Sequence, residues 1–149
     1  MKTTNNPLML VLLSLSLLIG ICGVAKADGA AEGWRKVVFH VDEMRNARWA
    51  LMLAGAYLDE SPDAKVMIVT YGPGIDFLLE DAKDRNGSPY DPAVFTLSTR
   101  GVGFLVCAET LDARNIDPKR VLDGVKVVPS GIDEIVRLQL KEGYAYLKP

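Results

Sequence analysis

The sequence predicts an α/β fold, a single domain of three layers in which helices cover both faces of a mainly parallel sheet of about five strands. Segments with the pattern of strands alternate along the chain with segments that have the pattern of helices. The strand segments are continuous apolar runs, which are typical of strands buried on both faces. The chain has 149 residues, of which 49% are hydrophobic and 24% are charged. This size and composition fit one globular domain.

The first 27 residues have the features of a secretory signal. Lys2 precedes an uncharged apolar run over 8–24, and Val24 to Ala27 ends in an Ala-x-Ala pattern. A charged start, an apolar core and small residues at the end predict cleavage after Ala27. A membrane anchor would need about 20 apolar residues, and a lipoprotein site at Cys22 would follow the poorly suited Ile21. We therefore expect a signal peptide (1–27) and one mature domain (28–149), periplasmic or secreted, with no membrane contact after cleavage.

Cleavage changes both the charge and the cysteine count. The mature chain keeps 15 Lys and Arg residues against 19 Asp and Glu residues, a net charge of −4. An acidic domain argues against nucleic acid as a partner. Cys22 is lost, so Cys107 is the single cysteine and cannot form an internal disulfide. A lone thiol in an exported protein is buried and inert, paired between chains, or used in function.

After a flexible leader at 28–34, β-branched and apolar residues predict strands, at 36–41, 64–71, 102–107, 125–128 and 144–147. Helix formers and capping residues predict helices, at 46–58, 75–83, 92–100, 108–115 and 131–142, with a helical turn at 117–122. Asp91 and Ser130 are the expected N-caps of two of them, and 84–91 is expected to form a mobile loop. The helix at 46–58 is apolar on nearly all sides, which indicates either a subunit contact or ordinary burial within the domain.

Candidate functional residues gather where the predicted strands end. Sites in parallel sheets form beyond the carboxyl ends of the strands. Six residues fall in these segments: His40, Gly72, Gly74, Cys107, Glu109 and Ser130. The single histidine and the single mature cysteine thus share one edge of the sheet.

Each of the main candidates has a functional and a structural interpretation. Cys107 precedes a helix, whose N-terminal N–H groups favour a nucleophilic thiolate, whereas Glu109 opposes this effect; the alternative is a buried cysteine that acts as a small hydrophobe. His40 is a candidate proton donor or acceptor for that thiol, or a histidine bonded to backbone. The turn from Gly72 to Gly74 offers N–H groups for an anion, or is simply a turn. Glu109 and Ser130 are candidate ligand-binding residues.

No cofactor or metal is expected. The glycines do not form a Walker or dinucleotide fingerprint, and no serine lies in a Gly-x-Ser-x-Gly elbow. One cysteine, one histidine and scattered acids lack the spacing of metal ligands.

Four segments carry a family resemblance: VVFHVDE (37–43), VTYGPGI (69–75), GVGFLVCAETLDARNI (101–116) and VVPSGIDEIVRLQLKEGYAYLKP (127–149). Over 36–149 the chain resembles the DsrE/DsrF-like proteins, in particular their exported branch. The resemblance implies a compact α/β domain that assembles into homotrimers or homohexamers. It also implies a persulfide on Cys107, because cytoplasmic relatives pass sulfur on a cysteine placed in this way.

Two functions are therefore expected. In the first, the protein is a periplasmic sulfur carrier that takes sulfane sulfur from a donor protein onto Cys107 and passes it to an acceptor protein. In the second, it is a non-catalytic periplasmic oligomer that binds a small ligand or a protein partner at the same edge. A thiol redox or metal-trafficking role for Cys107 and His40 is a third, weaker interpretation. The sequence leaves open whether the protein is an enzyme.

Overall fold

A computed structural model describes residues 35–149. The predicted signal peptide (1–27) and leader (28–34) lie outside the described residues. Five strands of the described chain form one sheet: β1 (Lys36–Val41), β2 (Lys65–Thr70), β3 (Gly103–Cys107), β4 (Lys126–Val128) and β5 (Ala145–Leu147). Their order is β4-β3-β2-β1-β5, and every neighbouring pair is parallel. The predicted parallel α/β fold is confirmed.

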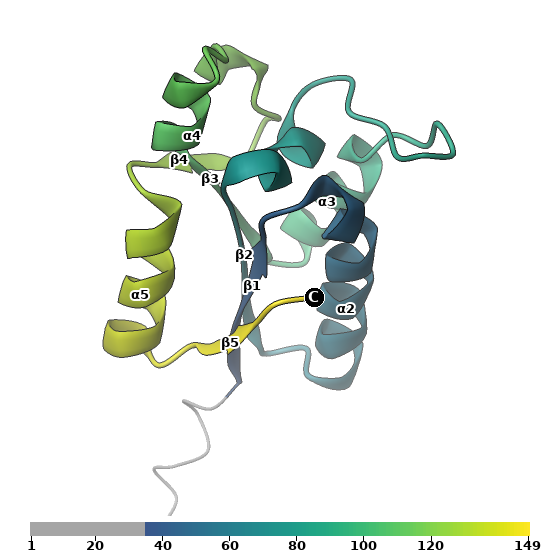
Figure 1. Cartoon of the computed structure of the whole chain (residues 1–149). Coiled ribbons are helices and arrows are strands. Elements are labelled where there is room, and N and C mark those ends of the chain that lie inside the picture. The colour runs from purple at the N-terminus through teal and green to yellow at the C-terminus, as the bar shows by residue number, and fades with distance from the viewer. Residues whose placement is uncertain (1–34) are drawn as a thin grey trace, which may run out of the picture.

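The helices form layers on both faces of this sheet (Figure 1). They are α2 (Ala47–Glu60), α3 (Asp91–Thr99), α4 (Ala108–Ala113) and α5 (Gly131–Glu142), with short 3-10 helices η1 (Met44–Asn46), η2 (Gly72–Leu78) and η3 (Pro118–Arg120). The chain steps in one direction from β1 to β4 and then returns across the sheet to β5. Because crossovers between parallel strands are right-handed, this return places α5 on the face opposite α2 and α3.

Two apolar clusters fill the spaces between the layers. The larger lies on the α2 side and is built on Val37, Phe39 and Val41 of β1. The smaller lies on the α5 side, where Val38, Val69, Leu105 and Val128 of four neighbouring strands meet Ile135 and Leu138. Alternate residues of each strand therefore enter opposite clusters, which explains why the strands are apolar throughout. His40, two residues after Val38, faces the α5 side.

Two local predictions were wrong. The helix expected at 75–83 is the 3-10 helix Gly72–Leu78, after which Leu79 is extended and pairs with Val121. The cause is the close packing of this segment against β1: a Cβ on Gly74 would collide with the carbonyl of Val41. Asp91 is the first residue of α3 rather than its cap, which is Tyr90.

Ser130 is the N-cap residue of α5 as predicted, but its side chain makes no capping hydrogen bond. No helix in residues 35–149 is long and apolar enough to cross a membrane.

Candidate functional site

Cys107 lies at the junction of a strand and a helix. It is the last residue of β3 and the N-cap residue of α4, with an extended backbone. Its thiol is free, and only 3% of the residue is exposed. The placement matches the prediction that the thiol lies at the carboxyl edge of the sheet beside a helix N-terminus. The burial means that a reactant must enter between the surrounding elements.

The first residue of α5 lies directly against Cys107. A Cβ built on Gly131 would be 3.2 Å from the Cβ of Cys107 and 3.3 Å from both the Thr70 carbonyl oxygen and the Tyr71 ring. Glycine is the residue that permits this approach without displacement. Two helices, α4 and α5, thus begin beside the same cysteine, and the N-terminal end of each helix carries partial positive charge.

Tyr71 lies between the cysteine and the histidine, and sequence reasoning did not single it out. Its ring is in reach of the Gly131–Cys107 contact and lies 4.4 Å, centroid to centroid, from the ring of His40. Burial raises the pKa of the Tyr71 hydroxyl, and the charge of Asp42 acts in the same direction. The hydroxyl therefore stays protonated at neutral pH. Alternation along β2 indicates only the face of Tyr71, which lies two residues after Val69 and so faces α5, and not its contact with His40.

His40 is buried on the α5 side of β1, with 4% of the residue exposed. Its Nδ1 lies 2.7 Å from the hydroxyl of Tyr146 in β5, and its buried Nε2 has no hydrogen-bond partner among the described residues. Burial lowers the pKa of His40; Asp42 partly opposes this effect, and Lys148 adds to it. The imidazole is therefore neutral at pH 7.

His40 and Cys107 are not neighbours. The strand register aligns His40 with Val69 and Val69 with Leu105, so Cys107 lies two strands away and two residues further along. With strands about 4.8 Å apart, that separation is on the order of 10 Å across the sheet alone. The two side chains are therefore too far apart to exchange a proton directly. Tyr71 lies in the space between them.

An ion pair closes the β1 side of the site. Asp42, the residue after β1, pairs with Lys148 from the end of the chain. The hydrogen bond from Lys148 lowers the pKa of Asp42 and raises that of Lys148. The pair ties the C-terminal segment to the sheet edge close to His40.

The backbone N–H groups of the glycine turn after β2 form hydrogen bonds within the protein. Gly72 has a positive φ of 56°, and its N–H donates to the Thr110 hydroxyl at 3.0 Å. The N–H of Gly74 donates to the Tyr71 carbonyl at 3.1 Å. Both of these donors are thus committed to holding the turn against α4 and β2. The expected anion-binding role of Gly72 and Gly74 stays a prediction.

Glu109 and Ser130 flank the Cys107–Gly131 contact. Glu109 is exposed in the first turn of α4, and its backbone N–H donates to the carbonyl of Pro129 at 3.3 Å. Ser130 is half-buried immediately before Gly131. The ligand-binding role of Glu109 and Ser130 stays a prediction. Across residues 35–149, no group of three or more His, Cys, Asp or Glu residues could hold a metal ion.

Comparison with known proteins identifies the family. Residues 36–149 match the model of the DsrE/DsrF-like family. A protein of unknown function from Methanobacterium thermoautotrophicum, MTH1491, is 37% identical, with a TM-score of 0.62, and the match covers 76% of this chain and 97% of that one. The ychN protein of E. coli shares the fold at 18% identity, with a TM-score of 0.64 and coverage of 76% and 98%. No curated protein matched the chain. The chain belongs to the DsrE/DsrF-like family, which is associated with sulfur relay.

Proposed function

We propose that the protein carries sulfane sulfur as a persulfide on Cys107, in the periplasm or outside the cell. The observation that supports this proposal best is the free thiol of Cys107 at the β3–α4 junction, enclosed by two helix N-termini, in a chain of this family. Sulfur carriage needs one nucleophilic sulfur in a protected site and no metal. Burial protects a persulfide on Cys107 from other thiols in solution, which would otherwise remove its outer sulfur.

The transfer needs no external oxidant or reductant. Cys107 Sγ attacks the outer sulfur of a donor persulfide, R–S–SH, and a new S–S bond forms on Cys107 as the S–S bond of the donor breaks. The bonding electron pair and the proton released by Cys107 end on the donor as R–SH. An acceptor thiol then attacks the outer sulfur of Cys107, takes up that sulfur, and restores the Cys107 thiol by the same exchange.

Mass spectrometry of the intact protein tests this proposal. After exposure to a polysulfide, the chain is expected to gain one sulfur atom that a reducing thiol removes. The measurement uses the mature chain (28–149), which lacks Cys22, so Cys107 is its single cysteine and Cys107→Ser abolishes the adduct. An adduct that forms on the unfolded chain but not on the folded one contradicts the proposal.

A second candidate is a non-catalytic oligomer that binds a ligand or partner at the same edge. Exposed apolar side chains on two helices favour it. Trp49 and Met52 of α2 are 53% and 52% exposed, and α5 exposes Ile132, Val136 and Leu140. A native protein that takes up no sulfur, with a Cys107→Ser variant of unchanged assembly, would favour this second function over the first.

A further inference from the structure

A second group of residues, away from Cys107, is formed by the segment 83–90 and the start of α2. A mobile loop was expected at 84–91, whereas in the structure hydrogen bonds close residues 83–90 into a defined turn. Lys83 pairs with Pro89, the Asp84 N–H donates to the Ser88 carbonyl at 2.9 Å, and the Gly87 N–H donates to the Asp84 carbonyl at 2.9 Å. One oxygen of the Asp84 carboxylate accepts from the N–H groups of Asn86 and Ser88.

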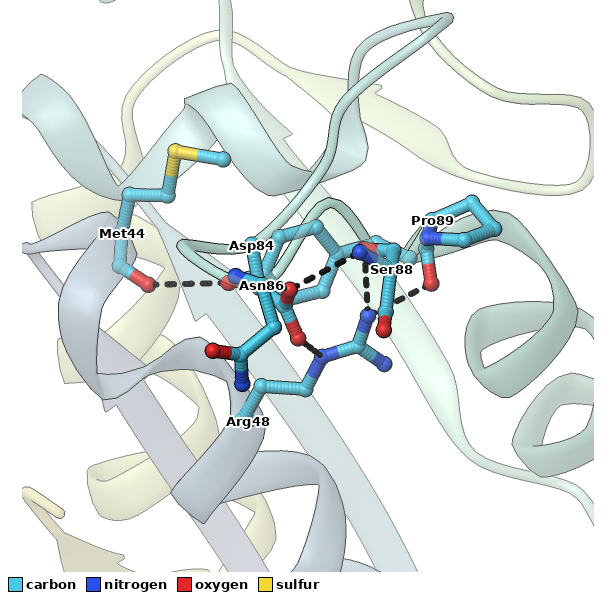
Figure 2. Close-up of polar contacts among 7 residues, drawn as sticks. Met44, Arg48, Asp84, Asn86, Ser88 and Pro89 are labelled. Carbon is cyan, nitrogen blue, oxygen red and sulfur yellow. Dashed lines mark hydrogen bonds and ion pairs between the residues drawn. The ribbon is translucent and has the colours of Figure 1, made fainter.

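Arg48 of α2 clamps this turn to the domain (Figure 2). Its Nε donates to the second carboxylate oxygen of Asp84 at 2.9 Å, and its Nη2 donates to the carbonyls of Ser88 and Pro89. The guanidinium also lies 4.2 Å from the centre of the Tyr90 ring. The charge of Asp84 is therefore already matched by Arg48 and by backbone N–H groups.

The clamped turn forms one wall of a cavity of about 230 Å³. The other wall is η1, and the lining residues are Met44, Arg45, Lys83, Asp84, Arg85 and Tyr90. Three of these are cations, although the chain as a whole has a net charge of −2. Within residues 35–149, none of the three forms an ion pair. The single acid, Asp84, is committed to Arg48, so the cavity carries an uncompensated positive charge.

We propose that this cavity binds a small dianionic oxyanion of the sulfate, thiosulfate or phosphate class. Like charges that line one cleft concentrate its positive potential and attract anions. Arginine donors match the oxygen geometry of such anions, and a charge-assisted hydrogen bond is roughly twice as strong as a neutral one. Lys83 adds a further point charge. Hydrogen bonds already define the backbone of the turn, so less backbone ordering is needed on binding.

This site is independent of the sulfur-carrying proposal. It shares no residue with the surroundings of Cys107, and its turn extends from the molecule on the side away from α4 and α5 (Figure 1). It would bind an anion whether or not Cys107 takes up sulfur.

Titration of the purified protein with sodium sulfate, with total ionic strength held constant by sodium chloride, tests the inference. We expect saturable shifts of the backbone amide NMR signals of η1 and residues 83–90. Lys83→Ala combined with Arg85→Ala should weaken binding at least about tenfold. The matched control, Lys119→Ala with Arg120→Ala, removes the same charge from the exposed helix η3 and should bind as the unmodified protein does.

Parallel titrations with thiosulfate and phosphate identify which oxyanion the cavity prefers, and tighter binding of any of the three than of chloride supports the site. Equal weakening in the two double variants overturns the inference, because it would show only a response to overall charge. Shifts that rise linearly with concentration, or that spread over the whole surface, also overturn it.

Discussion

At the scale of single residues, the contact between Gly131 and Cys107 is the most sensitive point of the candidate site. The space at Gly131 accepts a hydrogen atom but is tight for a methyl group, with three neighbours at 3.2–3.3 Å. We predict that Gly131→Ala slows the uptake of sulfur by Cys107 and lowers the free energy of unfolding by about 1–3 kcal/mol, the usual cost of overpacking. Labelling kinetics and denaturant unfolding measure both effects.

Gly55 provides the matched control for this substitution. It lies within α2, where a Cβ would meet its nearest neighbours at an ordinary 3.8 Å. Gly55→Ala should leave the reaction of Cys107 unchanged and stabilise the helix by up to about 1 kcal/mol. Equal labelling rates in the two variants would show that Gly131 does not control access to the thiol.

His40 gives a second residue-scale prediction, which concerns pH. Because burial lowers its pKa in the folded protein below the ordinary value of 6.5, the unfolded chain binds a proton first as the pH falls. Stability should therefore decrease as the pH falls below about 6.5, whereas the lowered pKa of Asp42 acts only near and below its ordinary value of 3.8.

Urea denaturation of the protein and of His40→Gln at several pH values from 7 to about 5 tests this slope, since that window lies below the ordinary histidine pKa and above the carboxylate range. The variant should show a flatter dependence on pH. Parallel slopes in the two proteins would mean that His40 titrates alike in the folded and unfolded states.

The same residues show how far a site can be predicted from sequence. Cys107 and His40 could be placed at one edge because each lies at or next to the end of a recognisable strand. Tyr71 could not be singled out, because its contact with His40 depends on the neighbour relation of β1 and β2 and on their register. The separation of His40 from Cys107 has the same cause, since β2 lies between their strands.

At the scale of elements, local composition predicted the strands and helices whose positions do not depend on long-range packing. The five strands and the helices α2, α3, α4 and α5 lie close to their expected positions, because long apolar runs and helix formers dominate those segments. The helix expected at 75–83 was wrong because Gly74 must approach Val41, and such a long-range contact leaves no periodic signal.

Arg48 provides a prediction for the turn at 83–90. Arg48→Met removes an ion pair and two carbonyl contacts while keeping a long apolar chain, so we expect faster amide hydrogen exchange throughout the turn. The pair is partly exposed, so the loss of stability should stay near 1 kcal/mol.

Arg100→Met is the control for this change, since Arg100 is equally exposed but forms a single exposed pair with Asp59. It should leave exchange in the turn unchanged and cost less than about 0.5 kcal/mol. Similar exchange in the two variants would show that the turn keeps its shape without Arg48.

At the scale of the whole molecule, the order of the strands could not be predicted from the sequence. Apolar runs indicate that a strand is buried but not which strands lie next to it. That order, β4-β3-β2-β1-β5, places α5 alone on most of one face. Ile135 and Leu138 lie on the inner side of α5 and are buried. Ile132, Val136 and Leu140 follow one another at intervals of four residues and stay 58%, 46% and 81% exposed. An exposed apolar stripe of this kind marks an interaction surface.

We propose that the homotrimer or homohexamer implied by the family resemblance assembles through this stripe. Leu140→Lys should therefore reduce the assembly to smaller species while the fold persists, which sedimentation velocity and circular dichroism can measure together. Gln139→Lys adds the same charge one position away on the exposed surface of α5 and should leave the assembly intact. If both variants sediment as the unmodified protein does, α5 is not the contact, and the exposed Trp49 and Met52 of α2 become the next surface to substitute.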